Sequence, residues 1–550
     1  MYSREFIEIL YKRGIEGEKE IEEFLSPSPQ TTYLPSLMNN LDESVGFILS
    51  EIRNNSRICI YGDYDADGIT ATALMVSILS HVSAEGQVGY YIPSRFEEGY
   101  GLNYEALKTI KEKGFDVVVT VDCGSVSANE VSYAREIGLK IVVTDHHSIS
   151  DVMADGLVVN PREKNSSYPF TYLSGCGVAF KLAQAIQRKM DLPKRVLVEV
   201  LDLVAIGTIG DIMPLLGENR TLCKYGLRQL NTGQRFGLRK LVEAIGLNMG
   251  HLTSENVSFV IVPHLNASGR IEDASLAVKL LLAKEGNPNV GRMVEELINK
   301  NQERRRIQNE TFEACLEIIG QEAPPFIVLN LDNGHEGITG IVAGKIKEIY
   351  NRPTIIFTPS GDEGEYLKGT GRSVEGINLY ETLNKYKHLF ERFGGHSGAC
   401  GLLIKKENLT ELRENLIEDM LKLEDEDPAA FERKYDIDIY MEDRKLTTSF
   451  SKEIDLMAPF GKDNGRPLIG FRDVTVGDVR YMGKQREHVK FYTENAYGDM
   501  VQWVLFGPSD EEKAYFRTGN KVNVLGSLDI NVWNGEEALQ VMIKKIEEAN

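Results

Sequence analysis

Short apolar runs alternate with amphipathic stretches in the first third of the chain. The stretches between the runs, such as 70–82 and 128–138, have the apolar spacing of helices that bury one face. Continuously apolar strands that alternate with helices are typical of a parallel sheet covered on both faces. We therefore predict such a sheet, with strands at 57–61, 116–122, 140–145 and 156–160.

The rest of the chain predicts further folded regions, which make the protein a multidomain α/β protein. Residues 288–319 have the pattern of one long polar helix, of the kind that joins domains. A second, smaller α/β unit follows, and after the acidic segment 424–428 many short alternating runs favour a β-barrel, with an OB-fold as the leading candidate. The expected parts are a polar lead-in (1–45), the parallel-sheet domain (46–285), the linking helix (286–321), the smaller α/β domain (322–430) and the barrel (431–550).

The charge of the chain is unevenly distributed. The 550 residues include 62 basic and 82 acidic side chains, a net charge of −20, which argues against a basic nucleic-acid coat protein or a membrane-surface binder. Residues 405–443 hold fourteen acidic and six basic side chains, and residues 1–52 hold ten and four. Because these two segments carry most of the excess, the rest of the chain is compatible with a locally basic groove.

The cysteines and the N-terminal residues indicate a compartment. The six cysteines are scattered without a Cys-x-x-Cys pair, which argues against a disulfide framework or a structural zinc site. The first residues lack the basic and apolar segments of a signal peptide, and no run approaches the ~18 apolar residues of a membrane span. We expect a reduced cytoplasmic protein without membrane association.

Carboxylates and imidazoles follow three of the predicted strands and one apolar helix. The ligand crevice of an open parallel sheet lies beyond the carboxyl ends of its strands, so these side chains are expected to converge there. They are Asp63, Asp65 and Asp67 after the first strand, Asp122 after the second, Asp145, His146 and His147 after the third, and Asp211 after the helix.

A cluster of carboxylates of this kind favours the binding of divalent cations. Several carboxylates within a few ångströms repel one another, and divalent cations remove that repulsion. Many carboxylate oxygens, one or two imidazoles and no thiolate suit Mn²⁺ or Mg²⁺ better than zinc, and a pair of ions about 4 Å apart can activate water at a phosphodiester. A lone Asp-x-Asp is usually a turn or a helix cap, but four elements together are harder to dismiss. Asp145 could instead orient His147 without touching a metal.

The sequence resembles a known family. Residues 61–68, 121–124, 145–147 and 207–214 are similar to the four motifs of the DHH phosphoesterases. The stretches 266–275, 394–401 and 458–464 extend the resemblance to the RecJ exonucleases of that superfamily, over nearly the whole chain. One departure is Gly334 before His335, where relatives usually carry tryptophan.

The resemblance implies roles for the clustered residues. Two ions, Mn²⁺ or Mg²⁺, would be held with Asp67 and Asp122 near both, and Asp63 is a plausible additional ligand. His147 would contact the scissile phosphate or hold the site through its neighbours. The implied catalytic residues are Asp65, Asp67, Asp122, His146, His147 and Asp211, and the metal ligands are Asp63, Asp65, Asp67, Asp122, His146 and Asp211.

Two glycine-rich segments, 368–373 and 394–398, have the chemistry to hold a phosphate backbone. Taken alone, each is more often an ordinary loop or turn, and Arg270 is equally compatible with a buried structural arginine. The resemblance implies that the two segments face the metal site across a cleft. The candidate DNA-binding residues are Arg270, Arg372, Ser373, Gly395, His396 and Ser397.

The function that the resemblance implies is metal-dependent 5′-to-3′ hydrolysis of single-stranded DNA to mononucleotides in DNA repair and recombination. It further implies a monomer that works with single-stranded-DNA-binding protein and a RecQ-type helicase. Two alternatives stay open: a DHH phosphodiesterase for short oligonucleotides or cyclic dinucleotides, and a non-catalytic RecJ-related replication scaffold. The choice between Mn²⁺ and Mg²⁺ and the tolerance of RNA cannot be read from the residues.

Overall fold

The computed structural model describes residues 2–95, 98–149, 152–271, 274–320, 322–361, 364–533 and 536–549. Glu272 and Asp273, within the 266–275 motif, lie outside these ranges. The chain forms two compact units. The first unit comprises Met1–Val262, Val278–Asn287 and Tyr435–Asn550, and the second comprises Pro263–Ala277 and Pro288–Lys434.

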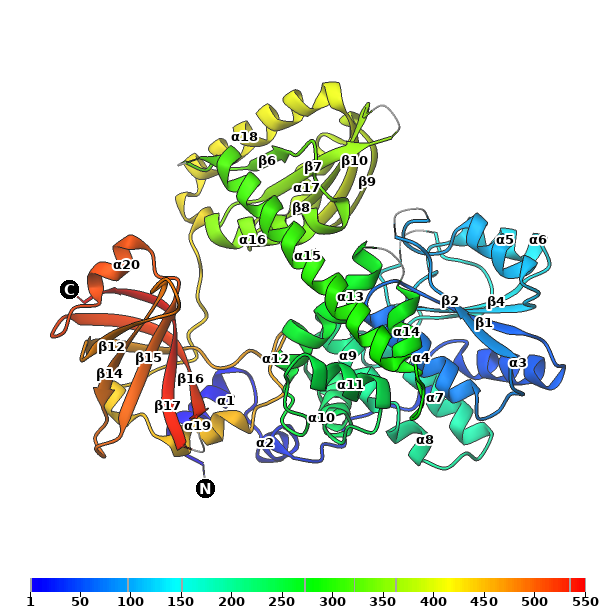
Figure 1. The fold of residues 1–550 in the computed structure, drawn as a ribbon, viewed down its shortest axis with the longest axis horizontal. Coiled ribbons are helices and arrows are strands. Elements are labelled where there is room, and N and C mark those ends of the chain that lie inside the picture. The colour runs from blue at the N-terminus through cyan, green and yellow to red at the C-terminus, as the bar shows by residue number, and fades with distance from the viewer. Residues whose placement is uncertain are drawn as a thin grey trace. The chain divides into compact units, whose positions relative to one another are not determined.

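A parallel five-stranded sheet organises the N-terminal part of the first unit (Figure 1). Its strand order is β2-β1-β3-β4-β5, and all neighbouring strands pair in parallel. The four predicted strands are confirmed, and β2 is an additional edge strand. The strands are β1 (Ile58–Gly62), β2 (Val88–Tyr91), β3 (Val117–Val121), β4 (Lys140–Thr144) and β5 (Val158–Val159).

Helices surround this sheet, and two of them are almost entirely buried. In α4 and α9 nearly every residue is inaccessible, because both consist of small and apolar side chains that pack against each other and against α7. A short π-helical segment, Val257–Ile261, directly follows α12. The helices are α3 (Leu41–Arg53), α4 (Ala66–Leu79), α5 (Tyr104–Glu112), α6 (Ala128–Glu136), α7 (Gly175–Lys189), α8 (Arg195–Val198), α9 (Leu201–Gly210), α10 (Gly217–Asn231), α11 (Phe236–Ala244) and α12 (Ser254–Asn256).

The second unit contains the predicted long helix, α15 (Val290–Ile319), and a mixed sheet of order β6-β7-β8-β10-β9. β6 and β7 pair in parallel, and the remaining pairs are antiparallel. The strands are β6 (Ile327–Asn330), β7 (Thr354–Ser360), β8 (Tyr366–Arg372), β9 (Phe390–His396) and β10 (Ala399–Lys405). The other helices are α13 (Val262–Ile271), α14 (Ser275–Leu281), α16 (Glu336–Tyr350), α17 (Leu379–Asn384) and α18 (Leu409–Glu426).

The prediction of two glycine-rich loops in this unit was wrong for 368–373, and for 394–398 it holds only at the turn formed by Ser397 and Gly398. Most of 368–373 belongs to β8, and the first residues of 394–398 belong to β9. Two of these glycines serve close packing across the sheet, since a Cβ at Gly369 would lie 2.6 Å from the ring of Phe357 and a Cβ at Gly395 would lie 2.3 Å from the backbone oxygen of Ala399. Glycine weakens the alternating pattern that identifies a strand in sequence, which explains the error.

The C-terminal part of the first unit is a seven-stranded sheet of order β11-β12-β16-β17-β15-β14-β13. Phe471, Phe491 and Trp503 pack together in its core. Its strands are β11 (Ile439–Tyr440), β12 (Ile469–Thr475), β13 (Val479–Met482), β14 (His488–Glu494), β15 (Met500–Phe506), β16 (Lys521–Trp533) and β17 (Glu536–Glu548), with the helices α19 (Thr448–Asp455) and α20 (Asp510–Tyr515).

Residues 1–45, expected to be a polar lead-in, contain two helices that complete this C-terminal core. They are α1 (Arg4–Lys12) and α2 (Glu18–Leu25). Phe6, Ile9 and Leu10 are fully buried against the seven-stranded sheet, although the helices are otherwise rich in charge. Within the described ranges, no helix is both long enough and apolar enough to cross a membrane.

Candidate active site

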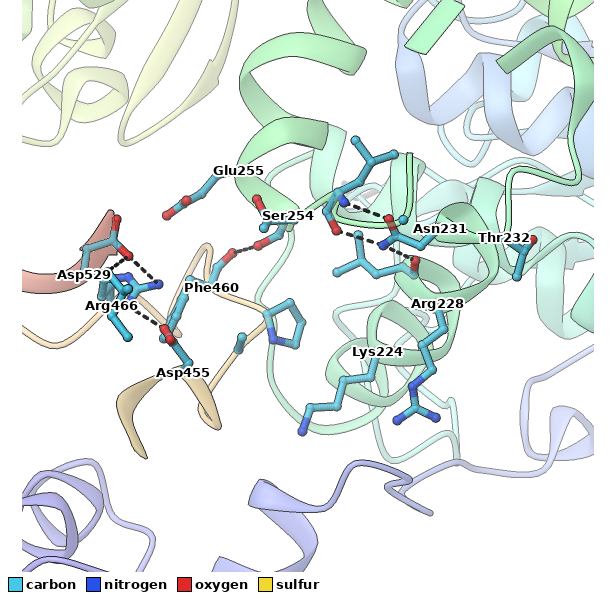
Figure 2. A pocket seen from close by; sticks show the side chains of 17 residues that line it. Lys224, Arg228, Asn231, Thr232, Ser254, Glu255, Asp455, Phe460, Arg466 and Asp529 are labelled. Atoms are coloured by element: carbon cyan, nitrogen blue, oxygen red, sulfur yellow. Dashed lines mark hydrogen bonds and ion pairs between the residues drawn. The ribbon is translucent and has the colours of Figure 1, made fainter. Parts of the chain in front are cut away.

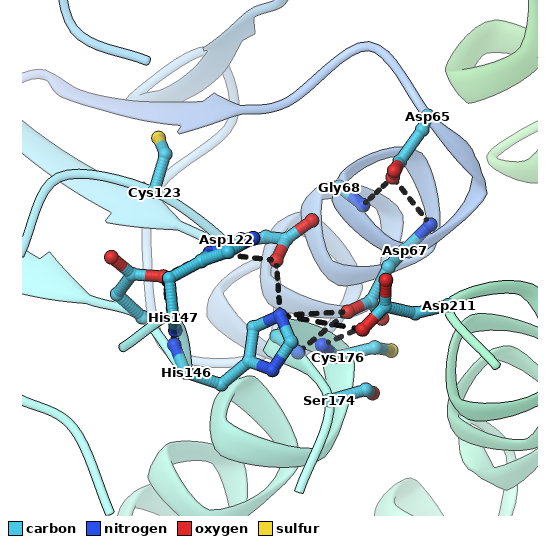
Figure 3. Close-up of polar contacts among 12 residues, drawn as sticks. Asp65, Asp67, Gly68, Asp122, Cys123, His146, His147, Ser174, Cys176 and Asp211 are labelled. Atoms are coloured by element: carbon cyan, nitrogen blue, oxygen red, sulfur yellow. Dashed lines mark hydrogen bonds and ion pairs between the residues drawn. The ribbon is translucent and has the colours of Figure 1, made fainter. Parts of the chain in front are cut away.

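The first carboxylates lie in the turn from β1 into α4 (Figure 3). The Asp65 side chain caps the helix, because its Oδ1 accepts hydrogen bonds from the backbone amides of Asp67 (2.9 Å) and Gly68 (3.2 Å). On either side of this cap, Asp63 is 3% exposed and Asp67 is 1% exposed. A tight strand-to-helix turn therefore places three carboxylates within five residues of chain, two of them buried.

Asp67 is also held by a second helix. Its carboxylate accepts hydrogen bonds from the amides of Gly175 (2.6 Å) and Cys176 (3.0 Å) at the start of α7. Glycine makes this approach possible: a Cβ at Gly175 would lie 2.4 Å from the Cβ of Asp122, and a Cβ at Gly207 of α9 would lie 2.4 Å from Oδ1 of Asp67. Three helices and the end of β3 thus meet with no room for another side chain.

His146 lies at the centre of the cluster (Figure 3). Its Nε2 is 3.1 Å from Oδ1 of Asp122, 3.4 Å from Oδ2 of Asp211 and 3.9 Å from Oδ2 of Asp67. Asp122 ends β3 with φ 67°, a left-handed conformation that non-glycine residues adopt rarely and that is often found at functional sites. The strand ends and the end of α9 therefore converge on one imidazole.

The donor atoms of this cluster fit divalent cations. Among the residues that the structure describes, four buried atoms of the cluster that could bind a metal make no hydrogen bond. They are Oδ1 of Asp63, Oδ1 of Asp122 and both ring nitrogens of His146, although Nε2 of His146 lies close to Oδ1 of Asp122. Buried polar atoms are rarely left unpaired, and carboxylate oxygens with imidazole and no thiolate suit Mn²⁺ or Mg²⁺. Three overlapping groups have donor atoms within 4.8 Å of one another, namely Asp122, His146 and His147; Asp67, His146 and Asp211; and Asp63, Asp65 and Asp122.

The electrostatics of the cluster point the same way. Burial, reinforced by the charge of Asp65, raises the pKa of Asp67 to about 7. Burial and the charge of Asp67 raise the pKa of Asp211 to about 8, and burial with neighbouring carboxylates raises the pKa of Asp122 well above its usual range. Burial lowers the pKa of His146 to about 3, so its imidazole is neutral and able to bind a metal. Without cations, burial and mutual repulsion therefore oppose the ionisation of these carboxyl groups.

Asp145 orients His147, as one interpretation of the sequence suggested. Nδ1 of His147 lies 2.8 Å from Oδ1 of Asp145, and the backbone amide of Ser125 donates to the other carboxylate oxygen at 2.9 Å. Burial opposes the charge on His147, but the hydrogen bond and the charge of Asp145 raise its pKa to about 9. The side chain is 43% exposed. His147 is thus a cation at neutral pH that is partly open to solvent beside the carboxylates.

Sequence reasoning missed the residues that follow β2. The hydroxyl of Tyr100 lies 3.0 Å from Nδ1 of His147 and donates to the backbone oxygen of Asp122 at 3.4 Å. In the same segment, the guanidinium of Arg95 stacks 4.9 Å from the ring centroid of Tyr64. β2 is short and contains a glycine, so its pattern is weak. Recognising it as a strand would have indicated that the residues after it reach the same sheet edge.

In the second unit, five of the six candidate DNA-binding residues lie at one end of the mixed sheet. Ala399 at the start of β10 pairs with Arg372 of β8 on one side and with His396 of β9 on the other, so both residues lie at the same end of the sheet with β10 between them. His396 is exposed. The five residues are Arg372, Ser373, Gly395, His396 and Ser397.

Two of the candidate DNA-binding residues, Ser373 and Arg270, make hydrogen bonds within the fold. Ser373 is 8% exposed, and its hydroxyl donates to the backbone oxygen of Ile377 at 2.8 Å. Arg270, the sixth candidate, donates from Nη1 to the backbone oxygen of Gly337 at 2.8 Å and so ties α13 to the start of α16. The hydroxyl hydrogen of Ser373 is therefore committed within the fold.

Three family models match the chain. The DHH family N-terminal domain matches residues 57–208, the DHHA1 domain matches 323–422, and the RecJ OB domain matches 437–545. The single-stranded-DNA-specific exonuclease RecJ of Bacillus subtilis is 35% identical over 542 residues, which cover 98% of this chain and 67% of that protein. The RecJ of Escherichia coli is 30% identical over 574 residues, which cover 97% of this chain and 94% of that protein.

The structural comparison agrees with these matches. The crystal structure of RecJ in complex with Mn²⁺ from Thermus thermophilus has a TM-score of 0.83 at 28% identity, covering 99% of this chain and 76% of that one. The structure of RecJ from the same organism in complex with Mg²⁺ has a TM-score of 0.76 at 27% identity, covering 99% of this chain and 75% of that one. With matches to the DHH, DHHA1 and RecJ OB domain models and identity of 30% or more to RecJ proteins along nearly the whole chain, this chain belongs to the RecJ family of DHH phosphoesterases.

Proposed function

We propose that this protein is an exonuclease that hydrolyses single-stranded DNA from the 5′ end to mononucleotides, in DNA repair and recombination. The observation that carries the proposal is the buried cluster of carboxylates around His146, at the carboxyl ends of a parallel sheet in a RecJ-family chain. The named relatives act on single-stranded DNA, and the matched Thermus structures hold Mn²⁺ or Mg²⁺.

Two cations would be held by the six predicted ligands. Asp67, His146 and Asp211 form one set of donors, and Asp63, Asp65 and Asp122 form the other. When bound, two divalent cations activate water as the nucleophile, orient the phosphodiester and stabilise the leaving 3′ oxygen. The chain contributes rigidity: the amides of α7 fix one carboxylate and the start of α4 fixes another.

His147 has a separate role in this proposal. It is a partly exposed imidazolium held by Asp145, so it can donate a hydrogen bond to a non-bridging oxygen of the scissile phosphate. Tyr100, whose hydroxyl lies against the same ring, limits the rotation of that ring. A fixed positive donor favours the phosphorane-like charge that develops during hydrolysis.

We assign the grip on the DNA backbone to the second unit. Arg372 and His396 contact phosphates from the two strands that flank β10, the peptide groups at Gly395 and Ser397 approach the backbone, and Arg270 and Ser373 support them. The assignment rests on the placement of these groups at one end of the sheet and on the low base specificity that phosphate contacts confer. In this division, 46–285 performs the chemistry, 286–321 links, 322–430 holds phosphates, and 431–550, completed by the helices of 1–45, binds the strand further along.

The cellular setting is part of the same proposal. We assign the protein to the cytoplasm as a monomer, with single-stranded-DNA-binding protein and a RecQ-type helicase as partners. A helicase would supply the single strand that such an exonuclease consumes, and the binding protein would present it. Pull-down of either partner by the purified chain, and its mass in solution by light scattering, test these assignments.

A degradation assay separates the proposed function from its alternatives. The purified protein is incubated with Mn²⁺ or Mg²⁺ and with a length series of single-stranded DNA labelled at either end, with duplex DNA, RNA and a cyclic dinucleotide as comparisons. Early release of 5′-labelled mononucleotide from long single strands supports the proposal. Activity confined to di- and trinucleotides or to the cyclic compound would favour a DHH phosphodiesterase. Absence of both cleavage and Mn²⁺ binding would favour a scaffold.

A further inference from the structure

Asp211 is followed by a short loop outside the sheet. Asp211 is the C-cap of α9, three residues beyond the segment that matches the DHH domain model. The loop that follows it, 212–216, leads into α10. Ile212 adopts φ 55° and is 68% exposed, whereas Leu215 is 1% exposed. Whatever holds the buried part of this loop therefore holds the end of α9 and its carboxylate.

The loop is held by a segment far away in the sequence. The amide of Leu215 donates to the backbone oxygen of Lys462 at 2.9 Å. Gly461 packs against the side chain of Leu215, since a Cβ at Gly461 would lie 2.7 Å from Cδ1 of Leu215. The contacting segment, 457–464, precedes β12 in the part of the chain that matches the RecJ OB domain model.

The 457–464 loop is itself rigid. The side-chain amide of Asn464, which is 2% exposed, donates to the backbone oxygens of Met457 (2.9 Å) and Pro459 (2.8 Å). Gly461 and Asn464 also exchange backbone hydrogen bonds at 3.0 and 3.2 Å. Both donors of the buried amide are used, so the loop has one well-defined conformation.

The same loop is anchored to two helices of the 46–285 domain. Nη1 of Arg220, in α10, donates to the backbone oxygen of Met457 at 2.7 Å. The hydroxyl of Ser254, in α12, donates to the backbone oxygen of Phe460 at 2.6 Å, as Figure 2 shows. Pro459 and Phe460 also line a cavity of about 710 Å³. The loop is thus hydrogen-bonded both to α10, the helix that follows Leu215, and to α12.

We propose that the 457–464 loop positions the Asp211 carboxylate and thereby sets the affinity for one of the two cations, with Gly461 and Asn464 as the positioning residues. The inference rests on the proposed function, because it takes Asp211 as a metal ligand. Groups that orient a ligand from outside the coordination sphere typically change metal affinity roughly 10- to 100-fold. A segment assigned to the DNA-binding OB domain is in this way part of the metal site's support.

The test is Mn²⁺ binding by the full-length protein without DNA. In Gly461→Val the added side chain displaces Leu215, and we expect the affinity at one of two Mn²⁺ sites to fall about 10- to 100-fold, measured by calorimetry and by electron paramagnetic resonance. Gly465→Val is the matched control, because a Cβ at Gly465 meets no atom of the described residues within 4 Å. It should bind Mn²⁺ as the unmodified protein does.

A second substitution distinguishes positioning from damage to the fold. Leu215→Ala in the Gly461→Val background removes the clashing atoms, and Mn²⁺ affinity should recover at least in part. Should Gly461→Val fail to fold, Gly461→Ala makes the same test with a smaller displacement. A folded Gly461→Val or Gly461→Ala protein that binds both ions with unchanged affinity would overturn the inference.

Asp211→Ala separates this inference from the proposed function. It should lose the same cation that Gly461→Val weakens. If Asp211→Ala binds both ions normally, the metal assignment behind the proposed function fails. If Asp211→Ala loses one ion and Gly461→Val loses none, the proposed function stands and only the role of the loop fails.

Discussion

The two sites proposed here are built in opposite ways. Around His146, buried carboxylates lie at the ends of buried parallel strands, with raised pKa values and unpaired donor atoms. In the second unit, His396 is an exposed residue of an edge strand, and the hydroxyl of Ser373 donates a hydrogen bond to the backbone oxygen of Ile377. The first site is under electrostatic strain until cations arrive, whereas the second is already satisfied.

This difference bears on function and on stability. Mn²⁺ or Mg²⁺ would compensate the charge of carboxylates that otherwise hold protons, so metal binding at the first site is coupled to proton release. A site with satisfied hydrogen bonds can bind and release a phosphate backbone without rearranging. The chemistry and the grip on the substrate are therefore expected to respond differently to mutation, pH and salt.

The largest effect is expected for Asp122→Asn. Loss of a central ligand should lower cleavage of single-stranded DNA by at least about 1,000-fold, equivalent to several kcal/mol of transition-state stabilisation. Burial and the neighbouring carboxylates oppose ionisation of Asp122, and an amide avoids that cost, so in EDTA at alkaline pH the variant should be more stable to unfolding than the unmodified protein by about 1–3 kcal/mol. Thermal unfolding and an end-labelled DNA assay measure the two effects. Asp155→Asn, at an exposed carboxylate, is the control and should change neither.

The second prediction concerns pH and metal removal. Because the pKa values of Asp67 and Asp211 are about 7 and about 8, Mn²⁺ must displace protons, and its affinity should fall by roughly 100-fold or more from pH 8 to pH 6. Calorimetry in buffers of different ionisation enthalpy measures the released protons. Binding without proton release at pH 7 would argue against the strained cluster.

The same shifts set the sign of the stability change. The unfolded carboxyls titrate near 3.8, so between about pH 4 and pH 8 the unfolded chain is ionised while the folded, metal-free protein retains its protons. Stability in EDTA should therefore fall as pH rises from 6 to 8. Saturating Mn²⁺ should remove that dependence.

A smaller effect is expected for Asp145→Asn, which tests whether His147 acts as a cation. Without the carboxylate, the pKa of His147 should drop from about 9 toward its usual value, and the alkaline limb of the pH–rate profile should move to lower pH. We expect roughly 10-fold slower cleavage at pH 8 and little change at pH 6. An unshifted alkaline limb would show that the charge of His147 is not used.

The smallest effect is expected at the second site, with Arg372→Ala. Loss of one phosphate contact should raise KM by about 10-fold with kcat nearly unchanged, and it should reduce the salt dependence of DNA binding by about one unit of slope. Arg392→Ala, an exposed arginine of β9 paired opposite Leu403, is the matched control. Equal effects of the two substitutions would remove the second site from the DNA path.

Much of the first site was predictable from the order of residues along the chain. Parallel strands buried on both faces are continuously apolar, and their carboxyl ends lie at one edge of the sheet. The sequence therefore predicts that Asp63, Asp122 and His146 lie close together. Tyr100 was missed because the pattern of β2 is short and interrupted by glycine. The strand residues within 368–373 and 394–398 were missed for a related reason: their glycines resemble turn residues in sequence, although Gly369 and Gly395 serve packing across the sheet.

By itself, the sequence determined the parallel sheet, the long helix α15, the C-terminal strands and the residues proposed to bind metal. These features can be predicted because apolar periodicity and the ends of strands depend on residues that are close together in the sequence. Only the tertiary structure decided how strongly those groups are perturbed, since pKa shifts and unpaired donors follow from burial by distant elements. It also decided that α1 completes the C-terminal core and that Gly461 contacts Leu215. Contacts between segments hundreds of residues apart depend on shape complementarity in the folded chain, which no local pattern records.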